Sequence, residues 1–199
     1  MGNLFASIIS VLSNPLLISI PLSYSLVLRS NGQVLYAIEW TLISLFFASI
    51  VGLFVIYGVK KGFFSDFDVS KREERTRLFV FAAMVSVVFL ATVLSTNGPR
   101  VLLFGVASLL LGIILADLIN QKIKASIHLA VFSSFSLVMG FLYGGIFWIL
   151  ILAAPLVAWS RIKLKKHEPL ETLVGSLVGI IIVLILYFIV KYIIGYYGE

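Results

Sequence analysis

Long apolar segments dominate this chain of 199 residues and decide what it can fold into. A helix needs about 20 mostly apolar residues to cross the hydrocarbon core of a bilayer. Stretches that meet this need occur at residues 4–30, 34–60, 77–96, 99–119, 126–143, 145–161 and 170–195. Only 12% of the residues are charged, whereas about a quarter are charged in soluble proteins. We therefore expect an all-α integral membrane protein, a bundle of six to seven transmembrane helices.

Proline and glycine mark where these helices should break or turn. The first stretch contains Pro15 and Pro21, which can kink or split it. Tight turns are marked by "SNG" at 30–32, "TNGPR" at 96–100 and "YGG" at 143–145. The chain has no internal repeat and no linker, so residues 1–199 are expected to form a single domain.

Basic residues are distributed very unequally between the two ends of the expected bundle. Seven crossings place the loops 61–76, 120–125 and 162–169 on one side and the tight turns on the other. Of the fifteen Lys and Arg residues, only Arg29, Arg100 and Lys191 fall on the second side, which leaves twelve on the first. Basic loops usually stay in the cytoplasm, so we expect a multi-pass cell-membrane protein whose polar loops are cytoplasmic. An alternative interpretation gives these charges no role beyond setting that orientation.

Three polar segments on the basic side carry the residue types of a phosphate site. They are "SDFDVSKREERTR" at 65–77, "KIKASIH" at 122–128 and "SRIKLKKHEPLE" at 160–171, and they include both histidines of the chain. An arginine guanidinium can donate to two phosphate oxygens at once, and imidazole can attack phosphorus or protonate a leaving oxygen. We therefore expect phosphate chemistry at the membrane surface, with no metal, no other cofactor and no nucleic-acid partner.

Each segment also has an ordinary structural interpretation. Ser70 and Ser126 can each cap a helix that follows them, and Glu171 can cap the helix expected to begin near Pro169. Exposed lysines near a helix end can simply extend to the lipid headgroups. A shared function is favoured because all three segments lie on one side, with each histidine at the entrance of a helix.

The three segments, in this order, resemble the motifs of the phosphatidic acid phosphatase type 2 superfamily of membrane lipid phosphatases. The third motif of that family is Ser-Arg, five residues, His, three residues and Asp. Arg161, His167 and Glu171 fit this spacing, with Glu in place of Asp. Pro169 and Gly175 fit the frequent continuation His-x-Pro-x-Asp-x-x-x-Gly.

The other two motifs are matched less closely. The second, Pro-Ser-Gly-His, is represented by "ASIH" at 125–128, in which the proline and the glycine are replaced. The first is absent in its strict form, but "DVSKREER" at 68–75 resembles the Asp-x-x-x-Arg-Glu-x-Arg variant of a divergent branch. Lys124, just before the second motif, is another feature of that branch. The resemblance covers about residues 60–180, the region expected to carry catalysis.

The resemblance implies a role for each matched residue. His167 would be the nucleophile that becomes phosphohistidine, Glu171 would orient it, and His128 would protonate the leaving group. The residues expected to hold the phosphate oxygens are Arg161, Arg72, Arg75, Lys124, Ser126 and Lys71.

Two functions from different classes follow from these features. The first is a metal-independent membrane phosphatase acting on a lipid phosphate or diphosphate: an isoprenoid diphosphate first, then phosphatidic acid or phosphatidylglycerol phosphate. The alternative is a non-catalytic membrane protein that binds anionic lipid or a partner through its basic face. A transporter is disfavoured because no stretch combines a Gly/Pro-broken centre with a buried charge.

Overall fold

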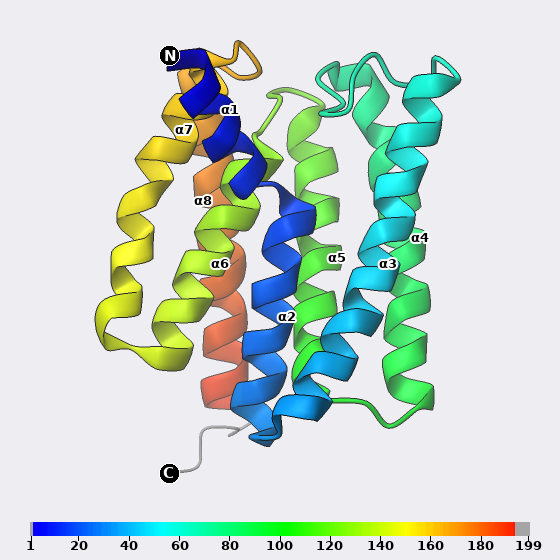
Figure 1. The fold of residues 1–199 in the computed structure, drawn as a ribbon, viewed down its shortest axis with the longest axis vertical. Helices are drawn as coiled ribbons and strands as arrows, with labels where there is room; N and C mark the ends of the chain where they lie inside the picture. The colour runs from blue at the N-terminus through cyan, green and yellow to red at the C-terminus, as the bar shows by residue number, and fades with distance from the viewer. Residues whose placement is uncertain (1, 194–199) are drawn as a thin grey trace.

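The computed structural model describes residues 2–193, and within them all regular secondary structure is helical (Figure 1). The described α-helices are α1 (Gly2–Leu12), α2 (Pro15–Asn31), α3 (Val34–Lys60), α4 (Arg72–Ser95), α5 (Arg100–Asn120), α6 (Ile127–Tyr143), α7 (Ala154–Lys163) and α8 (Pro169–Phe188). A 3-10 helix, η1 (Gly145–Ala153), precedes α7, and a π-helix, η2 (Ile189–Ile193), follows α8. The expectation of an all-helical bundle is confirmed.

Within the described residues, five helical segments are long and apolar enough to cross a membrane. They are α3, α4, α5, η1 with α7, and α8 with the start of η2. A sixth is added if α1 and α2, which are bent by 43° at the break between them, count as one span. Helix α6 is also apolar, but with 17 residues it is shorter than these spanning segments.

Several boundaries differ from those expected from the sequence. The stretch 4–30 is not one helix, because Pro15 has no N–H and Asn14 starts a new helix by accepting a hydrogen bond from Leu16 N at 2.9 Å. The first half of the stretch 145–161 winds as a 3-10 helix, which rises about 2.0 Å per residue and so lengthens this arm of the hairpin. The stretch 170–195 ends beyond the described residues.

The loops that carry the polar segments lie at one end of the bundle. Residues 61–71, 121–126 and 164–168 connect helices at the end where α1 also begins, whereas the tight turns lie at the opposite end (Figure 1). This sorting follows from the alternating direction of successive helices. The three motif segments therefore share one end of the molecule although they are up to about a hundred residues apart in the sequence.

Two glycines on α8 allow it to approach α6 closely. A Cβ atom at Gly175 would collide with the backbone carbonyl of Ser126, and one at Gly179 would collide with the carbonyl of Ala130. Small residues four apart on one face are a known device for close helix packing. The backbone of Ser126 also donates to the carbonyl of Glu171 at 3.0 Å. These contacts fix the start of α6, and with it the second motif, against the start of α8.

Candidate active site

His167 is held by a carboxylate in the short loop between α7 and α8. Its side chain is buried, and Nδ1 donates a hydrogen bond to Glu171 Oε2 at 2.8 Å. The same oxygen accepts from the backbone of Glu168 at 3.1 Å and lies 3.6 Å from Lys124 Nζ. Glu171 therefore caps α8 and orients the imidazole at the same time. Because Nδ1 carries the proton, the lone pair of the neutral ring is on Nε2.

Arg75 faces the other nitrogen of the His167 ring. Its side chain, 2% exposed, extends from the first turn of α4 and places Nη2 3.5 Å from His167 Nε2. Two backbone carbonyls hold the guanidinium, that of Val69 at 3.1 Å from Nε and that of Ala125 at 2.7 Å from Nη1. A positive group is thus fixed beside the free lone pair of His167.

Arg161 is buried at the end of α7. It is 1% exposed, and its Nη2 lies 3.3 Å from Asp68 Oδ2 in the loop before α4. Its Nη1 donates to the hydroxyl of Ser10 on α1, which packs against α7. Its Nε is buried and has no hydrogen-bond partner among the described residues. One donor of this guanidinium is therefore unsatisfied within the described residues.

His128 lies buried in the first turn of α6, where the charges of Arg161, Asp68 and Arg75 act on it electrostatically. No hydrogen bond of its ring is formed within residues 2–193. Nearby, the Ser126 hydroxyl at the N-cap of α6 is buried, makes no capping bond and has no partner in this described part of the chain.

The surroundings of His167 keep its imidazole neutral. Burial lowers the pKa of His167 far below its usual value, and the charges of Arg75, Arg161 and Lys124 lower it further. A positive charge on His128 would have the same effect. A neutral imidazole is the nucleophilic form.

The structure does not bring two of the expected phosphate ligands to the histidines. Arg72 is exposed and donates to the carbonyl of Lys122 at 3.3 Å, while Lys71 pairs with Glu74 at 3.6 Å. Both lie about one turn farther out than Arg75, because α4 begins at Arg72 and rises about 1.5 Å per residue. Of the first-motif cations, only Arg75 reaches the histidines.

Two capping expectations are not met: Ser126 holds the N-cap position of α6 but its hydroxyl makes no capping bond, and Ser70 is not an N-cap residue. Ser70 does not cap α4, whose N-cap residue is Lys71 and makes no side-chain capping bond. The Ser70 hydroxyl donates instead to Asp66 Oδ1 at 3.0 Å, since a carboxylate within the same loop is a strong acceptor.

Three charged residues that surround Arg161 and precede His167 were not predicted as site residues from the sequence: Asp66, Asp68 and Lys166. Asp68 pairs with Arg161, and Lys166 Nζ lies 3.6 Å from both Asp66 and Asp68. Asp68 had a signal, because it is the first residue of the variant motif, and Lys166 directly precedes His167. Ser10 had none, being one serine among many in an apolar stretch.

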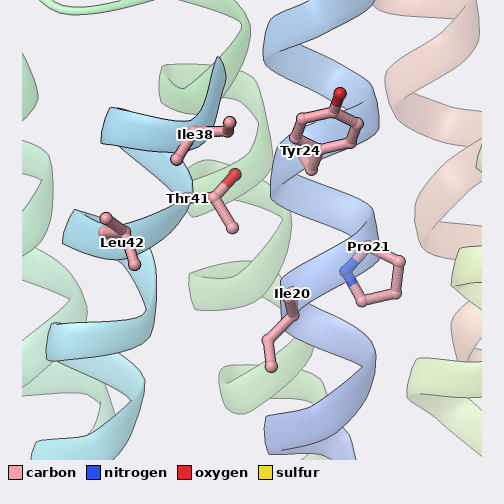
Figure 2. A pocket seen from close by; sticks show the side chains of 6 residues that line it. All are labelled: Ile20, Pro21, Tyr24, Ile38, Thr41 and Leu42. Carbon is pink, nitrogen blue, oxygen red and sulfur yellow. The ribbon is translucent and has the colours of Figure 1, made fainter. Parts of the chain in front are cut away.

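Two pockets of the protein differ in the side chains that line them. An apolar one of about 240 Å³ lies between α2 and α3 and has no charged side chain in its wall (Figure 2). Its walls are Ile20, Pro21, Tyr24, Ile38, Thr41 and Leu42. A polar one of about 330 Å³ adjoins the His167–Glu171 pair and is lined by Arg72, Lys122, Ile123, Lys124, Glu168, Leu170 and Glu171.

We call the group around the two imidazoles the histidine cluster; its members are His128, His167, Glu171, Arg75, Arg161 and Lys124. In the described residues, no three His, Cys, Asp or Glu side chains gather in a way that could hold a metal ion. No family model matches this chain. No curated protein and no solved structure matches it either. The chemistry of the histidine cluster must be inferred from its own side chains.

Proposed function

We propose that this chain is an integral membrane lipid phosphatase that uses His167 as its nucleophile. One observation carries the proposal: the His167 ring is oriented by a carboxylate on Nδ1, and its Nε2 faces a buried guanidinium. A carboxylate-oriented neutral imidazole is a nucleophile or base, and buried arginines stabilise the charge of a transferring phosphoryl group. The motif resemblance to the phosphatidic acid phosphatase type 2 superfamily supports the same roles.

The proposed reaction proceeds in two steps. His167 Nε2 attacks phosphorus, the bond from phosphorus to the leaving oxygen breaks, and His128, protonated at this stage, gives that oxygen a proton. Water then attacks phosphorus, the bond from phosphorus to Nε2 breaks and its electron pair returns to His167, and His128 takes a proton from the water as inorganic phosphate leaves. Arg75, Arg161 and Lys124 balance the charge on the phosphoryl oxygens in both steps, so the proposed reaction requires no metal.

The apolar helices favour a substrate that is itself anchored in the membrane. Five or six segments of spanning length suggest a multi-pass membrane protein. The histidine cluster then lies at the end of the bundle that carries the loops 61–71, 121–126 and 164–168. We propose that a lipid presents its phosphate there while its chains stay among the helices or in the bilayer. An isoprenoid diphosphate is the first candidate, followed by phosphatidic acid and phosphatidylglycerol phosphate. The Lys and Arg bias favours a cytoplasmic site.

A phosphate-release assay tests the proposal. Purified protein in a non-ionic detergent is given each candidate lipid with EDTA present, and released phosphate is measured. Wild type is expected to release phosphate, whereas His167→Ala should lose at least about a thousandfold in rate, as expected when a nucleophile is removed. Release that is equal in the two proteins, or that depends on added metal, would refute the proposed mechanism.

The polar hollow favours a second candidate, a protein that binds anionic lipid without turnover. Arg72 and Lys122 line it, and neither forms an ion pair with a carboxylate in residues 2–193. Vesicle binding that is unchanged in His167→Ala, with no phosphate released by wild type on any candidate lipid, would favour this function over catalysis.

A further inference from the structure

The buried guanidinium of Arg161 is paired with a carboxylate. Asp68 Oδ2 lies 3.3 Å from Arg161 Nη2, and the Asp68 side chain is about one quarter exposed whereas that of Arg161 is buried. The loop that carries Asp68 is held over the histidine cluster by Arg75, which binds the carbonyl of Val69. The contact therefore joins the first and third motif segments across the site.

This carboxylate also has a second cation within reach. Lys166 Nζ lies 3.6 Å from Asp68 Oδ2 and 3.6 Å from Asp66 Oδ2, and it contacts the Ser70 hydroxyl at 3.4 Å. If Asp68 leaves Arg161, it still has Lys166 as a partner. A buried guanidinium without any anion is costly, so Arg161 needs one negative partner in the empty site and can accept another in its place.

Resting on the proposed function, we infer that Asp68 is a positioning residue that serves as the resident anion of the Arg161 subsite. It holds the guanidinium in place while the site is empty and yields that position to a phosphate oxygen when substrate binds. Phosphate binding is then an exchange of one anion for another at Arg161. The loop around Asp68 is tied down less tightly in the phosphate complex than in the empty protein.

The exchange predicts an unusual result for a residue beside a binding site. Asp68→Asn removes the competing charge and should tighten the binding of inorganic phosphate about tenfold, the difference between a charged and a neutral acceptor at one contact. The same change should lower the unfolding temperature of the empty protein, and saturating phosphate should restore most of that loss. A purely structural role for Asp68 would weaken phosphate binding or leave it unchanged.

Asp66→Asn is the matched control. It removes the same charge from the same loop, and asparagine can keep the bond from Asp68 N to residue 66 Oδ1, which is 2.8 Å long. Asp66 has no ion pair with Arg161 in the described structure, so phosphate affinity should change less than about threefold.

Calorimetric titration of inorganic phosphate into the full chain in non-ionic detergent measures both variants. Tighter binding by Asp68→Asn but not by Asp66→Asn supports the inference. Weaker or equal binding by Asp68→Asn, in a protein whose wild type hydrolyses a lipid phosphate, overturns the inference and leaves the proposed function intact. Absence of phosphate binding in wild type and in both variants overturns the inference, and only the additional absence of lipid phosphate hydrolysis by wild type overturns the proposed function.

Discussion

Glu171 orients His167 and also caps α8, and a comparison of two substitutions can separate these roles. Its Oε2 orients His167 through Nδ1 at 2.8 Å and caps α8 through Glu168 N at 3.1 Å. Glu171→Gln keeps an oxygen that can accept these bonds but removes the negative charge. A hydrogen bond to a charged acceptor contributes about 1.5–3 kcal/mol, against about 0.5–1.5 kcal/mol for a neutral one. We therefore expect a loss of about 1–1.5 kcal/mol when the imidazole gains positive character in the transition state.

That loss corresponds to about a tenfold lower rate, and substitutions of groups that orient a reacting residue commonly cost about 10–100-fold. We expect kcat for lipid phosphate hydrolysis to fall by about this range while KM changes less than about threefold, because ground-state phosphate contacts remain. Glu168→Gln is the control, since Glu168 caps the same helix from its N-cap and forms no bond with His167. Equal kcat in the two variants would show that Glu171 serves only as a cap.

Helix packing, the pH dependence of stability and the leaving group can each be tested in the same purified protein. Gly175→Ala should destabilise the purified protein by about 1–3 kcal/mol, since its methyl group would collide with the Ser126 carbonyl. Gly105→Ala is the control, because a Cβ atom there would lie at an ordinary van der Waals distance of 3.7 Å from its nearest neighbour. Equal unfolding midpoints of the two variants would contradict the close packing. Thermal stability should fall as the pH drops below about 6.5, because His167 binds a proton there in the unfolded protein while its lowered pKa keeps it neutral in the folded protein. His167→Asn should flatten this pH dependence, and an unchanged slope in that variant would refute the prediction. His128→Ala should slow hydrolysis of a substrate with a poor alkoxide leaving group more than that of one with a good phenolate leaving group; uniform slowing would count against its role as the acid.

The helical bundle was predictable because apolar length alone decides which segments can form long helices. The break at Asn14 was visible in the Asn-Pro pair, but the 3-10 winding of Gly145–Ala153 was not, since an equally apolar run is compatible with either helix. Each long helix carries the chain to the opposite end of the bundle, so the number of helices between two loops predicted whether they share an end. That sorting is why both histidines could be expected at one end of the molecule.

The composition of the site was only partly predictable. The contact of His167 with Glu171 was expected if one helix included both residues. The structure shows the contact, but α8 begins at Pro169, and Glu171 reaches back to His167 across the N-cap Glu168. The choice of Arg75 over Arg72 depends on where α4 begins, and helix ends are uncertain by a turn from sequence alone. The pairing of Asp68 with Arg161 joins two distant loops, and no local pattern specifies such a contact.

The central claim, that His167 attacks phosphorus, is tested most directly by trapping the intermediate. Purified protein is mixed briefly with a lipid phosphate carrying a radiolabelled phosphoryl group, quenched in alkali, which preserves phosphohistidine, and digested for peptide mapping. We expect the label on the peptide that contains His167 in wild type and in Glu168→Gln, and no label in His167→Ala. Steady hydrolysis with no trapped label, or with label on another residue, would contradict this account.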